Sequence, residues 1–89
     1  MKVANKVVVV TGGGSGIGRQ LCLNLLAQGA HVAAADINVA GMAETAQLAG
    51  EWSKNFSSHA IDISNREKVH TLPQKVLEVH GRVDGIINN

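Results

Sequence analysis

The glycine-rich stretch Thr11 to Gly18, which reads Thr-Gly-Gly-Gly-Ser-Gly-Ile-Gly, limits the possible folds more than any other part of the sequence. It directly follows four valines at positions 7–10. β-Branched apolar residues at every position suit a strand that is buried on both faces of a parallel sheet. From Gly18 onward, apolar residues recur three and four positions apart, which is typical of one side of an amphipathic helix.

A strand that leads into a helix through a few glycines directs the helix N-terminus, with its free N–H groups, at whatever lies above the sheet edge. We interpret the stretch as a turn that holds the pyrophosphate of a dinucleotide. Gly12 is expected to take a positive φ, Gly16 to let the backbone approach phosphate, and Gly18 to let the helix pack closely on the strand. The alternative is a flexible loop without a ligand, because glycine also marks ordinary turns.

The rest of the chain repeats the alternation of strand and helix. Strands are predicted over residues 6–11, 32–36, 56–61 and 85–89. The first helix is predicted from Ser15 or Gly16 to Gln28, with its end at Gly29. Right-handed crossovers then give an α/β, Rossmann-type, doubly wound parallel sheet of the order β-α-β-α-β-α-β, with strand order 3-2-1-4.

Two further helices complete this pattern. Asn38 is expected to cap the second, whose apolar side is predicted to hold Val39, Met42, Ala43, Ala46 and Ala49. Residues 50–55 are predicted to form a loop. Ser64 and Glu67 resemble a capping box for the third helix, which should bend at Pro73 and end at Gly81.

Acidic residues at the strand ends indicate how the protein would recognise a dinucleotide. Asp36 lies 18 residues beyond Gly18, where an acid accepts hydrogen bonds from the adenosine ribose and repels a 2′-phosphate. Ile37 offers no positive charge for such a phosphate, and neither does Ser15. The expected cofactor is therefore NAD (NADH), unless Asp36 is only a turn former. Asp62 is interpreted either as an adenine contact or as a turn residue, and Asp84 as a turn residue.

Composition excludes several classes of protein. With 89 residues and a net charge of +1, the chain is at most one soluble globular unit without a nucleic-acid or membrane footprint. One cysteine, Cys22, allows no internal disulfide, and we expect it to be a buried packing residue. The four histidines lack metal or catalytic spacing and are expected to be loosely packed or exposed. No metal site is predicted, and the expected location is cytoplasmic.

The glycine stretch, Asp36, Asp62 and the closing Asn88-Asn89 together resemble the classical short-chain dehydrogenase/reductase family, with its TGxxxGxG turn, ribose-reading acid, strand-end Asp and NNAG segment. The resemblance implies hydride transfer between nicotinamide and a small-molecule alcohol or carbonyl substrate, in an enzyme that is a homo-oligomer. Its catalytic Ser, Tyr and Lys lie beyond Asn89, and this chain has no tyrosine. We therefore expect residues 1–89 to be a partial NAD(P)-binding Rossmann domain, cut before the catalytic segment and inactive alone.

The predicted cofactor-binding residues are Thr11, Gly12, Gly14, Ser15, Gly16, Ile17, Gly18, Asp36, Ile37, Asp62, Ile63, Asn88 and Asn89, and none is predicted to be catalytic. Asn88 is expected to order the strand beside the cofactor. One alternative is a non-catalytic dinucleotide-binding module. A methyltransferase that uses S-adenosylmethionine on a similar sheet is a further alternative, although its glycine turn is usually spaced differently.

Overall fold

The computed structural model describes residues 2–89, in which strands and helices alternate as predicted. The elements are β1 (Val7–Thr11), α1 (Gly16–Ala27), β2 (His31–Asp36), α2 (Val39–Ala49), the 3-10 helix η1 (Gly50–Asn55), β3 (Phe56–Ala60), α3 (Arg66–His80) and β4 (Gly85–Ile87). All pairings are parallel, in the order β3-β2-β1-β4. The predicted fold class and strand order are confirmed.

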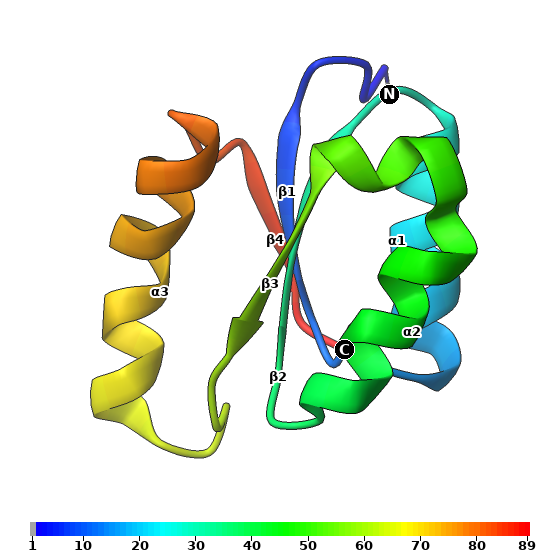
Figure 1. Ribbon diagram of the computed structural model, residues 1–89. Helices are drawn as coiled ribbons and strands as arrows, with labels where there is room; N and C mark the ends of the chain where they lie inside the picture. The colour runs from blue at the N-terminus through cyan, green and yellow to red at the C-terminus, as the bar shows by residue number, and fades with distance from the viewer. Residues whose placement is uncertain (1) are drawn as a thin grey trace.

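Helices cover both faces of the sheet. Helices α1 and α2 lie on one face and α3 on the other (Figure 1). The loops that follow β1, β2 and β3, and the residues after β4, all lie at the lower edge of the sheet in that view. This edge, at the carboxyl ends of the strands, is where ligands bind in open α/β sheets.

Alternating side chains of the buried strands supply the core of each face. Val8 and Val10 pack with Cys22 and Leu26 beneath α1, in a cluster that also includes Met42. The other cluster faces α3 and consists of Val7, Val9, Ala33, Ala35, Ile61, Leu72 and Val76. This two-residue period explains why residues 7–10 of β1 are all apolar. Cys22 is buried as predicted, and burial raises the pKa of its thiol to about 11.

The ends of the helices differ in part from the predictions. Helix α1 ends before Gly29, which has a φ of 88° and the expected left-handed conformation. Residues 50–55 form the turns of η1 rather than a loop.

The predicted capping box of α3 is wrong by one residue. Asn65 is the N-cap of α3, and its side chain accepts a hydrogen bond from Lys68 N at 3.2 Å. Ser64 instead donates its hydroxyl to Asp62. Helix α3 continues through Pro73 to the predicted end at Gly81.

The predicted apolar side of α2 is wrong in part. Val39 and Ala43 are exposed, whereas Thr45 is completely buried. The helix turns Met42 and Thr45 toward the sheet because the hydroxyl of Thr45 finds hydrogen-bond partners in the glycine turn. Apolar periodicity could not reveal this, since it scores threonine as a surface residue.

Three histidines, one each from β2, β3 and the end of α3, lie near one another. The expectation that all four histidines are loosely packed or exposed is wrong for His59, which is buried. The Oγ of Ser57 lies 2.9 Å from Nε2 of His59 and 2.8 Å from Nε2 of His80. The rings of His31 and His80 form an edge-to-face pair with centroids 6.0 Å apart. Parallel pairing places Ser57 and His59 on the same face as Ala33 and Ala35, which α3 covers.

Acid is expected to weaken this packing. Burial lowers the pKa of His59, and Lys75 lowers it further; burial, followed by His31 and His59, lowers the pKa of His80. As the pH falls below the ordinary value of 6.5, the unfolded chain takes up protons before the folded chain does, so the free energy of unfolding decreases until the folded pKa values are passed.

Urea denaturation at pH 7.5 and 5.5 tests this expectation. The midpoint should be lower at pH 5.5, and the difference should shrink in the double variant His59→Gln/His80→Gln. The matched control is His70→Gln on the exposed side of α3, which should keep the wild-type difference. An equal pH dependence in the wild type and the double variant would contradict the assignment.

Candidate dinucleotide site

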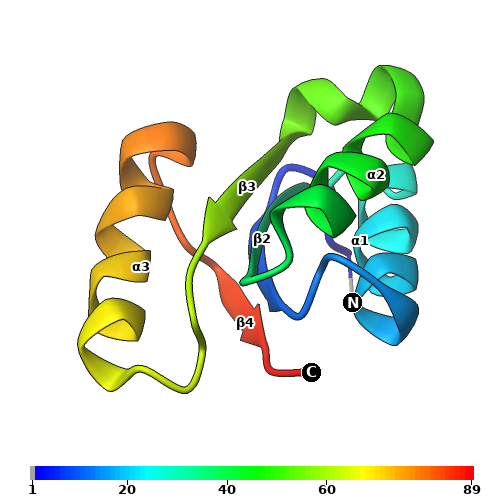
Figure 2. The ribbon, with the colours of Figure 1, turned by 60° about the horizontal axis from the view of Figure 1, so that its bottom comes forward.

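The glycine turn lies between β1 and α1 at the carboxyl edge of the sheet (Figure 2). Gly12 has a φ of 73°, as predicted, and its N–H donates to the carbonyl of Ala35 at 2.7 Å. Gly16 has a φ of 57°, and a Cβ built there would meet no atom within 4 Å. The first residue of the helix therefore faces open space, which fits the predicted approach of a phosphate.

Gly18 is where α1 packs against the turn. A Cβ on Gly18 would overlap the carbonyl group of Gly12 and would lie 2.8 Å from Nδ2 of Asn89. The close packing predicted for this glycine is therefore confirmed. Asn89 also lies against Gly12, so its side chain borders the turn.

Thr11 connects the turn to the residues after β4. Its Oγ1 accepts a hydrogen bond from Asn89 N at 3.0 Å and donates to the carbonyl of Ile87 at 3.4 Å. Asn88 is exposed beside this link. The fold thus brings Asn88 and Asn89 to the same side of the turn as Thr11, although 76 or more residues lie between Thr11 and these two asparagines in the sequence.

Asp36 bends back from the end of β2 onto the turn. Its Oδ2 accepts a hydrogen bond from Gly14 N at 2.9 Å, and its Oδ1 accepts one from Asn38 N at 3.1 Å. Each carboxylate oxygen has a second lone pair that can accept a hydroxyl proton. The residue therefore has the turn-forming role that was predicted as the alternative, and its carboxylate is held beside the glycines, while its contact with a ribose stays a prediction.

The remaining predicted residues near the turn are exposed. Ile17 is 73% exposed in the first turn of α1, and Ile37 is 70% exposed after Asp36. Ser15 occupies the N-cap position of α1 with an extended backbone, but its side chain does not cap the helix. Both isoleucines thus offer apolar surface to any molecule that lies across the turn.

Asp62 and Ile63 follow β3 at the same sheet edge, and both are exposed. The N–H and hydroxyl of Ser64 donate to Oδ1 of Asp62 at 3.0 and 2.6 Å. These bonds lower the pKa of the Asp62 carboxyl. A backbone bond from Ile61 N to Asp36 O, at 3.2 Å, joins the ends of β3 and β2. The structure brings Asp62 to the site edge and shows the turn role directly.

Sequence reasoning missed Arg19 and Thr45, which bind the carbonyl groups of the turn from its inner side. Gly41, in α2, also packs closely against the turn, because a Cβ there would overlap the carbonyl of Gly14. A basic residue directly after Gly18 was the one signal in the sequence, because an arginine so close to a glycine turn has carbonyl groups within reach.

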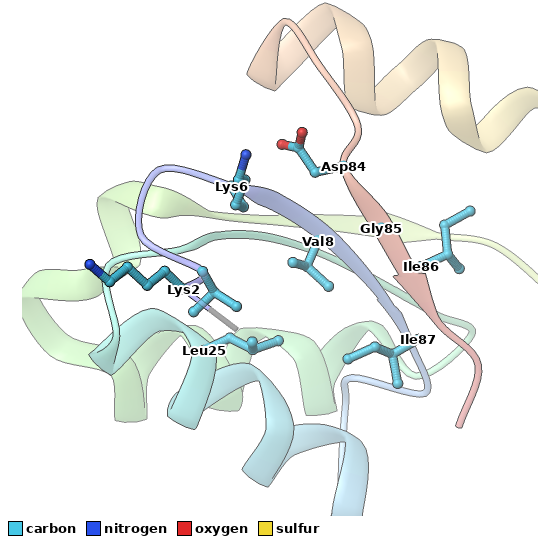
Figure 3. A pocket seen from close by; sticks show the side chains of 9 residues that line it. Lys2, Lys6, Val8, Leu25, Asp84, Gly85, Ile86 and Ile87 are labelled. Carbon is cyan, nitrogen blue, oxygen red and sulfur yellow. The ribbon is translucent and has the colours of Figure 1, made fainter.

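Two apolar grooves flank β4, and the smaller one is also lined by Thr11, the first residue of the glycine turn. One of about 410 Å³ lies on the α1 side, where Val8, Leu25 and Ile87 converge (Figure 3). Asp84 lies near one end of it, where Oδ2 accepts a hydrogen bond from Val7 N at 2.8 Å. Asp84 thus joins the start of β4 to β1 rather than forming the predicted turn, and its bonds with Arg82 and Val7 lower its pKa. A smaller groove of about 220 Å³ lies on the α3 side.

Within residues 2–89, no group of three or more metal-binding side chains comes together. No helix in the same range is both long and apolar enough to cross a membrane. The chemistry of this part of the chain therefore centres on the turn, the helix N-terminus and Asp36.

A parallel sheet of order 3-2-1-4, with a glycine turn at its switch point and an acid at the end of the second strand, defines a dinucleotide-binding α/β unit. The family model described as short chain dehydrogenase matches residues 6–89. The chain belongs to the short-chain dehydrogenase/reductase family, as the resemblance of its motifs predicted.

Known relatives agree with this assignment. A 2,5-dichloro-2,5-cyclohexadiene-1,4-diol dehydrogenase of Sphingobium indicum is 42% identical over 88 residues, which are 98% of this chain and 34% of the relative. The 3-ketoacyl-(acyl-carrier-protein) reductase of Brucella melitensis, solved with NADH, has a TM-score of 0.85 and 30% identity, covering 94% of this chain and 33% of that one.

A short-chain dehydrogenase/reductase of Burkholderia phymatum, solved in complex with NAD, has a TM-score of 0.88 and 28% identity, covering 97% of this chain and 31% of that one. The chain thus spans about a third of the length of the curated relatives that it matches.

Proposed function

We propose that the chain binds NAD(H) at the glycine turn and is the cofactor-binding part of a short-chain oxidoreductase. In this proposal the pyrophosphate lies over Gly16 at the N-terminus of α1, where the helix dipole and the free N–H groups favour an anion. Ile17, the next residue, is exposed, and the side chain of Asn89 lies against Gly12 and Gly18. The open space above Gly16, beside a turn whose other side is closely packed, supports this placement.

The observation that carries the proposal is the carboxylate of Asp36, held against the turn by Gly14 N. From this position the carboxylate would accept hydrogen bonds from the ribose hydroxyls of adenosine, and its charge would disfavour a 2′-phosphate. Ile37, next to it, brings no positive charge. Asp62 and Ile63, at the end of the neighbouring strand, are proposed to border the adenine.

The reaction proposed for the protein is hydride transfer between nicotinamide and an alcohol or carbonyl carbon. NAD supplies the hydride chemistry, and residues 1–89 supply binding and orientation. The similar enzymes are dehydrogenases and reductases, which supports an oxidoreductase. The catalytic Tyr of the family cannot lie within these 89 residues, because they contain no tyrosine. Binding and turnover are therefore tested separately.

NADH titration tests the binding proposal. We expect NADH fluorescence to saturate, and NADPH to bind at least about tenfold more weakly because its 2′-phosphate would lie beside Asp36, a difference of about 1.4 kcal/mol. S-Adenosylmethionine should not compete at the same concentrations. Direct binding of S-adenosylmethionine, measured by calorimetry, without binding of NADH would favour the methyltransferase instead. NADH binding without turnover of alcohols or carbonyls by the chain as its gene encodes it would favour the non-catalytic module.

A further inference from the structure

The inner side of the glycine turn is held by polar side chains at an otherwise apolar contact between helices. The hydroxyl of Thr45, in α2, lies 2.9 Å from the carbonyl oxygen of Gly13 and 3.1 Å from that of Gly41. It also accepts a hydrogen bond from Nε of Arg19 at 3.0 Å. Its neighbours Cys22 and Met42 are buried and apolar, so breaking these bonds would leave polar groups buried without a partner, which costs free energy.

Arg19, in α1, contacts the inner side of the turn beside Thr45. Its Nη2 donates to the carbonyl of Gly14 at 2.7 Å and to that of Gly41 at 3.1 Å, and it lies 3.6 Å from the carboxylate of Glu44. One guanidinium thereby joins α1, the turn and α2. The planar fork of arginine suits such a contact, and a lysine could not reproduce it.

These bonds determine how the turn presents its N–H groups. In a trans peptide the carbonyl oxygen and the following N–H point in opposite directions. Fixing the Gly13 carbonyl on Thr45 therefore directs Gly14 N–H toward Asp36, which accepts it at 2.9 Å. Fixing the Gly14 carbonyl on Arg19 likewise directs Ser15 N–H away from the helices, toward the open side of the turn.

We propose that Arg19 and Thr45 are positioning residues that shape the turn for the pyrophosphate of the cofactor. This inference rests on the proposed function, because it assumes that a phosphate-containing ligand binds there. The two residues touch no ligand. They act through the peptide planes of Gly13 and Gly14. Asp36, which would hold the ribose, keeps its hydrogen bond from Asn38 N at 3.1 Å, so the loss of either residue should weaken the binding of phosphates more than that of the nucleoside.

The experiment compares NADH, ADP and adenosine in the chain as its gene encodes it, with adenosine and ADP measured by competition against NADH. Thr45→Val keeps the shape of the side chain and removes the hydroxyl. We expect it to weaken NADH and ADP about tenfold, which is about 1.4 kcal/mol, and adenosine less than twofold. Thr45→Ser should restore ADP binding. The matched control is Thr71→Val in α3, whose exposed hydroxyl bonds Lys68 O, and it should leave all three affinities unchanged.

Two results with Thr45→Val would overturn the inference while leaving the NAD site intact: unchanged ADP binding, or equal weakening of ADP and adenosine. Should Thr45→Val not fold by circular dichroism, Arg19→Lys takes its place, with about fivefold weaker ADP expected and an unchanged value contradicting the inference. A wild-type protein that binds neither NADH nor ADP overturns the proposed function, and the inference with it.

Discussion

Replacing Gly18 with alanine is expected to destabilise the fold and to abolish tight NADH binding. The added Cβ would overlap the carbonyl group of Gly12, which cannot move away easily because Gly12 N is bonded to Ala35 O at 2.7 Å. Forcing a methyl group into a closely packed site costs about 1–3 kcal/mol. For a domain of this size, each kcal/mol lowers Tm by about 4–8 °C.

NADH affinity should fall further than stability alone explains, by about tenfold or more, because the turn must shift away from α1. The measurements are the Tm by circular dichroism and the NADH titration of the folded variant. Gly85→Ala is the matched control: its Cβ would meet no atom within 4 Å, and its Tm should stay within about 2 °C of wild type. A Gly18→Ala variant with wild-type Tm and affinity would show that α1 does not depend on this contact.

The second large effect is expected at the end of β2. The double variant Asp36→Asn/Ile37→Arg should move the preference from NADH toward NADPH by about 100-fold, roughly 2.7 kcal/mol. Asparagine removes the charge that repels a 2′-phosphate, and the arginine supplies a cation for it. Asn is chosen over Ala because its amide oxygen can still accept the hydrogen bond of Gly14 N, so the turn keeps its support.

The dissociation constants of NADH and NADPH for wild type and variant measure this shift. Asp36→Asn alone separates the loss of repulsion from the gain of the arginine. The control is Glu78→Gln, which removes an exposed carboxylate near the end of α3 and should leave the preference unchanged. An unaltered preference in the double variant would refute the role of Asp36, while the NADH site itself would stand.

The apolar grooves on both sides of β4 show where the described part of the chain has unpaired sheet surface. Ile86 lines both grooves and is 55% exposed. The curated relatives are about three times as long as this chain. Thr11 and Asn88, which border the glycine turn, line the groove on the α3 side, whereas neither of them lines the groove on the α1 side.

The sequence by itself determined the strand order, the glycine turn at the switch point and Asp36 beside it. These features follow from local rules: apolar runs and helical spacing mark the elements, and glycine marks positions that a side chain would block. The backbone roles predicted for Gly12 and Gly18 are confirmed for the same reason, because a tight turn and a close approach are local demands.

Only the tertiary structure decided the polar contacts between elements. Thr45 lies 32 residues from Gly13, and its hydroxyl bonds the turn only after α2 has packed on α1. His59 is buried because α3 returns over β3, and Ser64 leaves the predicted cap because Asp62 accepts its hydroxyl. Hydrogen bonds need a donor and an acceptor within about 3 Å, a condition that periodicity does not encode but packing creates. The glycine turn could be identified from the sequence, whereas Arg19 and Thr45, which hold it in shape, could not.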